Sequence, residues 1–188
     1  SGYVSSIATA KICMKKIIPI GFCLFFDLLI SAQDISFFHL SKKEGLSDNQ
    51  VAGVVMDKNG LLWVGTSEGL NCYDGYTVKR FYKEEYPALQ NNNILRMTCD
   101  EKNRLWIHFA DKSITMLDED RKFHAISILD NGKQVKADFL LPYTSRGVLF
   151  LSGSRLYYPN EKDPLLIKRL NWEEDTTLNN DFLRINIW

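Results

Sequence analysis

The sequence predicts an all-β fold, namely a partial β-propeller made of four-stranded antiparallel blades that repeat with a period of about 44 residues. Three observations support this prediction. Trp63 and Trp106 lie 43 residues apart, and each follows an aspartate, Asp57 or Asp100, at the same spacing. The first copy of the repeat contains four short apolar runs separated by turn residues. Aromatic residues make up 12% of the chain, and aromatic enrichment favours strands over helices.

The first copy shows how one blade is expected to form. Its four strands are expected at residues 51–56, 61–65, 70–73 and 78–82. Turn residues that include glycine separate them: Asn59-Gly60, Glu68-Gly69 and Asp74-Gly75. The fourth run alternates apolar and basic residues, which is typical of a half-exposed outer strand. Four antiparallel strands in about 44 residues make one propeller blade.

The later copies keep the same spacing but are less regular. In the third copy Phe150 stands in the position of the tryptophan, and a fourth copy begins at Leu178, three periods after Leu46. Residues 35–40 occupy the place of an outermost strand whose first three strands are missing, so we expect them to close the last blade of a ring. Three blades do not close a propeller, which typically needs about 4 to 8, so we expect a fragment of a longer protein.

The N-terminal segment is interpreted as a targeting sequence rather than as part of the fold. Lys15-Lys16 form a basic start, residues 17–30 form an apolar run, and Ala32 offers a small residue for cleavage. A bilayer span needs roughly 20 apolar residues, so a cleaved signal peptide is favoured over an uncleaved membrane anchor. The sequence therefore predicts export to the periplasm.

These observations divide the chain into seven expected segments. They are residues 1–13, an upstream extension or a remnant of expression; 14–32, a signal peptide; 33–44, the closing outer strand of the last blade; 45–86, blade 1; 87–130, blade 2; 131–175, a degenerate blade 3; and 176–188, the start of blade 4.

The residue patterns give little support to catalysis. Residues 65–69 match the G-x-S-x-G pattern of hydrolases, which requires a strand, a sharp turn and then a helix, whereas a strand is expected to follow here. The three histidines, His39, His108 and His124, have no metal-binding spacing with one another or with cysteines and carboxylates. We therefore expect no catalytic residue, no metal and no cofactor in this chain.

The first copy resembles the two-component regulator propeller repeat. The motifs that carry the resemblance are Leu46-Ser47-Asp48-Asn49, Asp57-Lys58-Asn59-Gly60, Leu62-Trp63-Val64-Gly65-Thr66 and Gly69-Leu70-Asn71-Cys72-Tyr73-Asp74-Gly75. The second copy departs from the pattern, because Ile107-His108-Phe109 replaces Val-Gly-Thr, and the third is recognised mainly by position. The resemblance extends over about residues 35–188 and is highly specific only over residues 45–82.

In the family, such repeats form the periplasmic sensors of hybrid two-component histidine kinases, which are common in gut Bacteroidetes. The resemblance therefore implies an extracytoplasmic ligand-sensing segment that detects a glycan-derived signal. It also implies that this fragment is not an enzyme, whereas the full-length protein is a histidine kinase anchored in the inner membrane and homodimeric. The partners that it implies are an oligosaccharide ligand and the remaining propeller blades of the same chain.

Two alternative functions remain open from the sequence. One is a secreted propeller enzyme, a lyase or glycan hydrolase, whose active site lies outside this fragment, and the other is a propeller that serves only as an interaction scaffold. A nucleic-acid partner is not expected, because 23 basic residues balance 23 acidic residues. The recurrent tryptophans are assigned to the wedges between blades. The candidates for stacking on a ligand are therefore the non-repeating aromatic residues Tyr86, Tyr143 and Trp172.

Overall fold

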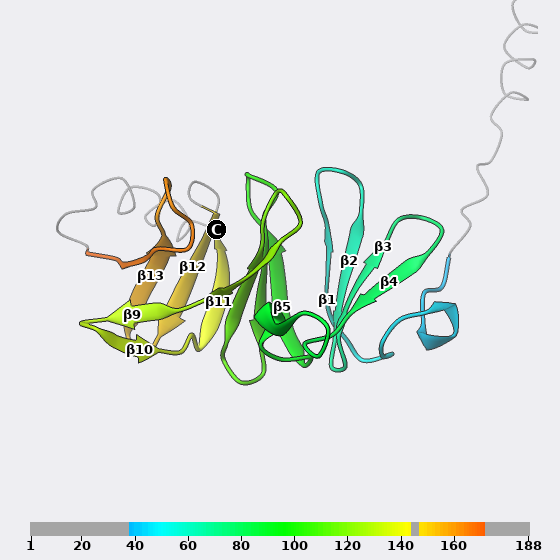
Figure 1. Ribbon diagram of the computed structural model, residues 1–188, viewed down its shortest axis with the longest axis horizontal. Coiled ribbons are helices and arrows are strands. Elements are labelled where there is room, and N and C mark those ends of the chain that lie inside the picture. The colour runs from blue at the N-terminus through cyan, green and yellow to red at the C-terminus, as the bar shows by residue number, and fades with distance from the viewer. Residues whose placement is uncertain (1–37, 144–146, 172–188) are drawn as a thin grey trace, which may run out of the picture. The chain divides into compact units, whose positions relative to one another are not determined.

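The computed structural model describes residues 38–143 and 147–171 (Figure 1). Over these residues the chain forms antiparallel β-sheets, and the helical elements are two 3-10 turns, η2 (Lys42–Glu44) and η3 (Pro87–Leu89). Three four-stranded sheets follow one another along the chain, and the strands of each sheet pair in sequence order. We call these sheets blade 1, blade 2 and blade 3. They confirm the predicted all-β propeller architecture.

The three blades share one strand pattern. Blade 1 comprises β1 (Val51–Met56), β2 (Leu62–Thr66), β3 (Leu70–Tyr73) and β4 (Val78–Phe81). Blade 2 comprises β5 (Ile94–Cys99), β6 (Leu105–Phe109), β7 (Ile114–Leu117) and β8 (Phe123–Ile126). Blade 3 comprises β11 (Phe139–Tyr143), β12 (Gly147–Ser152), β13 (Arg155–Pro159) and β14 (Ile167–Arg169). The strands of blade 1 begin and end within one residue of the predicted positions.

A two-stranded hairpin lies between blades 2 and 3, and the repeat period did not predict it. Its strands β9 (Ile128–Asp130) and β10 (Lys133–Val135) flank Asn131 and Gly132, which have positive φ angles of 50° and 77°. Such Asn-Gly turns match the natural twist of paired strands. Asp130 is only 8% exposed and accepts a hydrogen bond from the Tyr157 hydroxyl of β13 at 3.1 Å, which fixes the hairpin against blade 3.

Two buried apolar clusters join the blades, and each contains one of the recurrent tryptophans. The cluster between blades 1 and 2 includes Trp63, Leu70, Phe81, Met97, Leu105, Ile107 and Leu117. The cluster between blades 2 and 3 includes Trp106, Ile114, Met116, Leu140, Val148, Phe150 and Tyr157. The rings of Trp106 and Phe150 lie 5.6 Å apart, and both side chains are fully buried. The recurrent aromatic residues therefore fill the wedges between blades, as predicted.

The aspartate of each repeat links its turn to its tryptophan. In blade 1 the Oδ1 atom of Asp57 accepts hydrogen bonds from the backbone N–H groups of Asn59 and Leu61, at 2.9 and 3.0 Å. Its Oδ2 atom accepts from Nε1 of Trp63 at 3.0 Å. Burial alone would raise the pKa of Asp57, but these hydrogen bonds hold it below the usual value. Asp100 bonds Nε1 of Trp106 in the same way, at 2.9 Å.

Several predicted segments lie outside the described residues. These are residues 1–13, the predicted signal peptide (14–32), the first part of the predicted closing strand (33–37) and the predicted start of blade 4 (176–188). The described part of the predicted closing strand, residues 38–44, contains η2 and no strand. In the two described ranges, no helix is long and apolar enough to cross a membrane.

Candidate ligand-binding cleft

A cleft of about 540 Å³ lies between the outer strands of blades 1 and 2. This volume is within the range of about 300–1,000 Å³ that is usual for small-molecule sites. Its lining comes from the β1–β2 turn, from β2, β3 and β4 with the residues that follow them, and from β7, β8 and their connecting turn. The lining residues are Leu61, Trp63, Cys72, Asp74, Thr77, Lys79, Phe81, Tyr86, Leu117, Arg121 and Phe123. We call this site the aromatic cleft.

Three aromatic rings form one wall of the aromatic cleft. Phe81 ends β4, Phe123 begins β8, and Tyr86 lies immediately before η3. The Phe81 ring centroid lies 5.2 Å from that of Tyr86 and 5.6 Å from that of Phe123, while Tyr86 and Phe123 are 5.5 Å apart. The backbone N–H of Tyr86 donates to the Tyr82 carbonyl at 2.9 Å, so a tight turn after β4 positions the ring. Tilted and edge-on contacts at these distances are favourable.

Charged groups stand beside this aromatic wall. Arg121 comes from the β7–β8 turn of blade 2, donates through Nη2 to Asp57 Oδ2 at 3.0 Å, and lies 5.4 Å from the Trp63 ring centroid. The ammonium group of Lys79 lies 5.1 Å from the Phe81 ring centroid. Both contacts are cation–π interactions. The cleft therefore combines flat apolar faces with cationic hydrogen-bond donors.

Asp74 adds an anionic acceptor to the cleft. Its Oδ1 atom accepts hydrogen bonds from the backbone N–H groups of Thr77 and Tyr76, at 2.7 and 2.8 Å. These bonds lower the pKa of Asp74, so the carboxylate is ionised at neutral pH. Burial raises the pKa of the Cys72 thiol, which keeps it protonated and poorly nucleophilic. This chemistry suits the recognition of a polar ligand better than a covalent reaction.

The three residues predicted from the sequence have different surroundings. Tyr86 lines the aromatic cleft. Tyr143 is only 4% exposed and packs in an apolar cluster with Leu149 and Leu170, so little of its ring is accessible to a ligand. Trp172 lies outside the described residues.

Sequence reasoning missed two important residues of the cleft. Phe123 is also a non-repeating aromatic residue, so the criterion that selected Tyr86 applies equally to it. Arg121 follows the acidic residues 118–120, and no sequence signal connects it to Asp57, which lies in the preceding blade. A cleft between blades takes its residues from two repeats, so a comparison of repeats with each other does not reveal it.

The other sequence patterns have structural explanations. The G-x-S-x-G segment forms the β2–β3 hairpin, in which the Thr66 N–H donates to the Gly69 carbonyl at 3.0 Å, and a strand follows it. His108 is buried, and its Nε2 bonds the Ala137 carbonyl oxygen at 2.9 Å. His124 pairs with Asp118 at 2.6 Å. Across residues 38–143 and 147–171, no three histidine, cysteine or acidic side chains gather as metal ligands.

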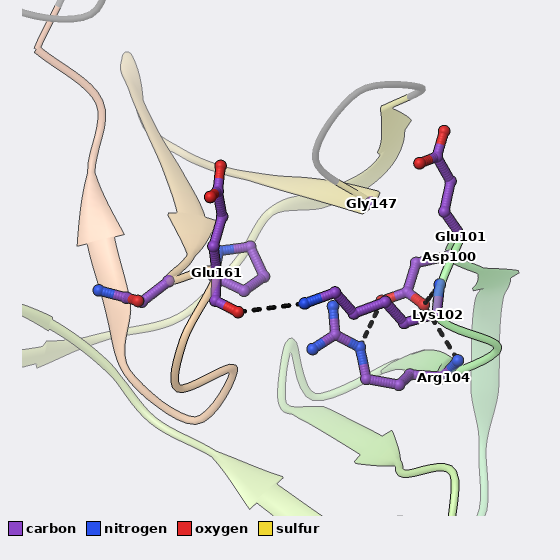
Figure 2. Close-up of a pocket in the computed structure, with 8 residues that line it drawn as sticks. Asp100, Glu101, Lys102, Arg104, Gly147 and Glu161 are labelled. Atoms are coloured by element: carbon purple, nitrogen blue, oxygen red, sulfur yellow. Dashed lines mark hydrogen bonds and ion pairs between the residues drawn. The ribbon is translucent and has the colours of Figure 1, made fainter.

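A second and smaller pocket lies between blades 2 and 3, and Figure 2 shows it in close-up. Its volume is about 290 Å³. It lies between the β5–β6 turn of blade 2 and the end of β13 in blade 3. The lining residues are Asp100, Glu101, Lys102, Arg104, Gly147, Pro159, Asn160 and Glu161. We call this site the polar pocket.

The fold and the spacing of the blades define a β-propeller segment. Residues 45–68 match the profile of the family "two component regulator propeller". Blade 1 therefore contains a two-component regulator propeller repeat, as the sequence motifs predicted. The match covers the first part of blade 1, which contains the Leu-Ser-x-Asn, Asp-x-x-Gly and Leu-Trp-Val-Gly-Thr motifs.

Other known proteins are similar to this chain in sequence or in fold. Histidine kinase P4 of Formosa agariphila is 43% identical over 70 residues, which are 35% of this chain and 5% of that protein. The extracellular domain of the putative hybrid two component system BT3049 from B. thetaiotaomicron superposes with a TM-score of 0.59 at 21% identity, over 74% of this chain and 20% of that one. The extracellular domain of the putative hybrid two component system BT4673, also from B. thetaiotaomicron, superposes with a TM-score of 0.57 at 16% identity. The superposition covers 74% of this chain and 19% of that one. These structural likenesses show the shared fold, and the chain spans only a small part of each relative.

Proposed function

We propose that this chain is an extracytoplasmic sensing segment of a hybrid two-component system and that it detects a glycan-derived signal. The observation that carries the proposal is the two-component regulator propeller repeat at residues 45–68, together with the 43% identity to a histidine kinase. In this proposal the full-length protein is a membrane-anchored, homodimeric histidine kinase. The kinase reaction then takes place in a part of the protein that lies outside this chain.

The aromatic cleft supports a carbohydrate as the signal. Sugar rings present apolar C–H faces that pack on aromatic rings, and Tyr86, Phe81 and Phe123 form such a wall. Sugar hydroxyl groups both donate and accept hydrogen bonds, and the cleft offers Arg121 as a donor and Asp74 as an acceptor. The cleft volume of about 540 Å³ accommodates a short oligosaccharide. We therefore propose that the ligand stacks on Tyr86.

Oligosaccharide binding by the full-length natural protein tests this proposal. A panel of neutral oligosaccharides is titrated calorimetrically, first against the unmodified protein and then against Tyr86→Ala. We expect one class of oligosaccharide to bind, and we expect Tyr86→Ala to weaken that binding by about fivefold or more, because stacking on an aromatic ring contributes roughly 1 kcal/mol or more.

Tyr76→Ala is the matched control for this test. Tyr76 is 93% exposed in the β3–β4 turn and does not line the aromatic cleft, so its removal should leave the affinity unchanged. The absence of binding by any oligosaccharide would contradict the proposed signal. Equal losses in the two variants would contradict the proposed site.

A further inference from the structure

An arginine contacts the aspartate–tryptophan pair of both blade 1 and blade 2. In blade 2, where Arg104 lines the polar pocket, its Nε atom donates to Asp100 Oδ2 at 2.6 Å (Figure 2). The same guanidinium group lies 5.6 Å from the Trp106 ring centroid. The pair of blade 1 receives both kinds of contact from Arg121, namely an ion pair and a cation–π interaction. The two pairs therefore have similar surroundings.

The two arginines reach these pairs from different blades. Arg104 belongs to the same blade as Asp100 and follows it by four residues. The residue equivalent to Arg104 in blade 1 is Leu61, which carries no charge. Arg121 comes instead from the β7–β8 turn of blade 2, so its ion pair with Asp57 crosses the junction between the two blades. The ion pair thus joins two blades at the aromatic cleft, whereas the pair of blade 2 is internal to that blade.

The backbone of Arg121 has a conformation that residues with a side chain rarely adopt. Its φ angle is 64°, in the left-handed region, which costs free energy for any residue that has a Cβ atom. The β3–β4 turn of blade 1 has Gly75 at its positive φ of 99°, and glycine adopts this region without that cost. The reach of the side chain therefore explains an arginine in the β7–β8 turn better than the turn itself does.

Arg121 can leave Asp57 without leaving a buried carboxylate unsatisfied. Asp57 also accepts hydrogen bonds from two backbone N–H groups and from Nε1 of Trp63. The Arg121 side chain is 39% exposed, so water can solvate it after release, whereas that of Arg104 is only 10% exposed. An ion pair with a partner as exposed as Arg121 contributes little to stability. The position on Asp57 and Trp63, which we call seated, therefore differs little in free energy from a released position.

We propose that Arg121 is a latch of the aromatic cleft, which in its seated position holds blade 2 against blade 1 and on release opens the cleft to Cys72. Cys72 pairs with Trp63 across β2 and β3, and both residues line the cleft together with Arg121. A ligand that contacts the aromatic wall from both blades favours the seated position, so ligand binding and the latch are coupled. The inference rests on the proposed function only in taking the aromatic cleft as the ligand site.

The rate at which iodoacetamide alkylates Cys72 tests the latch, because this thiol is buried while Arg121 is seated. The full-length natural protein, with its cysteines reduced, is labelled for increasing times, and mass spectrometry of the peptide that contains Cys72 gives the rate. We expect Arg121→Gln to raise this rate by about fivefold or more, because one interaction that keeps the junction closed is lost.

The charge of Arg121 acts on this rate in the opposite direction. Only the thiolate form of a cysteine reacts with the reagent. Burial raises the pKa of the Cys72 thiol, and the positive charge of Arg121 opposes that rise. Removal of the charge alone would therefore slow the alkylation, so a faster reaction in Arg121→Gln reports a more open cleft.

Arg104→Gln is the matched control, because it removes the same two contacts from the pair of blade 2, away from the aromatic cleft. We expect it to leave the Cys72 rate unchanged. Arg121→Lys should give an intermediate rate, because lysine keeps the charge but lacks the planar donor group. Cys99 does not line the cleft, and its rate in Arg121→Gln should equal that in the unmodified protein.

Equal Cys72 rates in Arg121→Gln and Arg104→Gln would overturn the latch. An equal acceleration of Cys72 and Cys99 in Arg121→Gln would also overturn it, because the whole junction would then have loosened. If either result appears while an oligosaccharide still requires Tyr86, only this inference is lost and the proposed function stands. A faster Cys72 reaction in a protein that binds no oligosaccharide would support the latch and contradict the proposed function.

Discussion

The tryptophan packs in the same way in blades 1 and 2, but different side chains stabilise the strand ends that lie away from the aspartate turn. In both blades an aspartate shapes the β-turn and accepts a hydrogen bond from the tryptophan of the next strand. In blade 1 a buried polar network of Ser47, Thr66 and Asn71 then ties the loop before β1 to β2 and β3. The positions equivalent to Thr66 and Asn71 in blade 2 are Phe109 and Thr115.

This difference explains which parts of the family motif are structural. The hydroxyl groups of Ser47 and Thr66 lie 2.7 Å apart, and the Asn71 side chain bonds both the Ser47 N–H and the Val64 carbonyl oxygen. All three residues are buried, so the motif serine and threonine, together with Asn71 of the segment 69–75, hold the blade together instead of contacting a ligand. Blade 2 replaces this network with the buried ring of Phe109, and it departs from the motif at the same positions.

The surfaces that the two blades offer to the next blade also differ. At Gly65 in blade 1, an added Cβ would lie 2.7 Å from Ile94 Cγ2, so the absence of a side chain lets blade 2 pack against bare backbone. Blade 2 has His108 at this position, and the imidazole reaches across to the Ala137 carbonyl oxygen instead. At consecutive junctions, a glycine and a hydrogen-bonded histidine therefore stand at the same position of the repeat, and each provides a contact with the next blade.

The largest effect is expected from removing a tryptophan. Trp106 is fully buried between blades 2 and 3, so Trp106→Ala should destabilise the protein by about 3–5 kcal/mol. Trp63 borders the aromatic cleft, so water can enter more easily beside it and Trp63→Ala should cost less. The midpoint of urea unfolding, followed by circular dichroism, measures both. Equal shifts of the two midpoints would mean that the two wedges are packed equally well.

An intermediate effect is expected from the polar network of blade 1. Asn71→Ala leaves the buried N–H and hydroxyl of Ser47 without this partner, which should cost about 1–3 kcal/mol. The equivalent change in blade 2, Thr115→Ala, removes a single hydrogen bond to the Ala88 carbonyl oxygen and should cost about 1 kcal/mol. Urea midpoints again compare the two. A greater loss from Thr115→Ala would contradict the role given to the network.

The smallest effect is a pH dependence that belongs to blade 2. Burial lowers the pKa of His108 below its usual 6.5, an effect that Arg96 reinforces, whereas the hydrogen bond to Ala137 and the charges of Asp111 and Asp138 oppose it. The unfolded chain therefore takes up a proton below pH 6.5 that the folded chain refuses, and stability falls as the pH falls. His108→Gln should flatten this part of the curve. Unfolding midpoints at pH 7.5 and 5.5 provide the measurement. If stability depends on pH equally in the variant and in the unmodified protein, a group other than His108 causes the effect.

The sequence predicted the fold well in the parts of the chain where the repeat motif is clear. The turn glycines and the aspartate–tryptophan spacing set the strands of blade 1, because each of these residues has a local geometric role. The β9–β10 hairpin was missed, although Asn131-Gly132 is a strong turn signal, because the connection between blades is free to vary in length. The repeat period therefore predicts blades better than it predicts the loops between them.

The candidate site was predictable only in part. Tyr86 was selected because it does not repeat, and it lines the aromatic cleft. The same criterion selected Tyr143, which is buried against Leu149 and Leu170, because the sequence does not show which side chains of a strand are buried. The position of Arg121 depends on the packing of one blade against another, which repeat spacing alone does not determine.

The most direct test of the sensing account is the phosphorylation of the full-length natural protein in membrane vesicles, with and without the oligosaccharide that binds best. The account predicts that the oligosaccharide changes the rate of autophosphorylation, that Tyr86→Ala abolishes this response at the same ligand concentration, and that Tyr76→Ala preserves it. A phosphorylation rate that no oligosaccharide changes, or a response that Tyr86→Ala leaves intact, would contradict the claim that blades 1 and 2 form the sensing site.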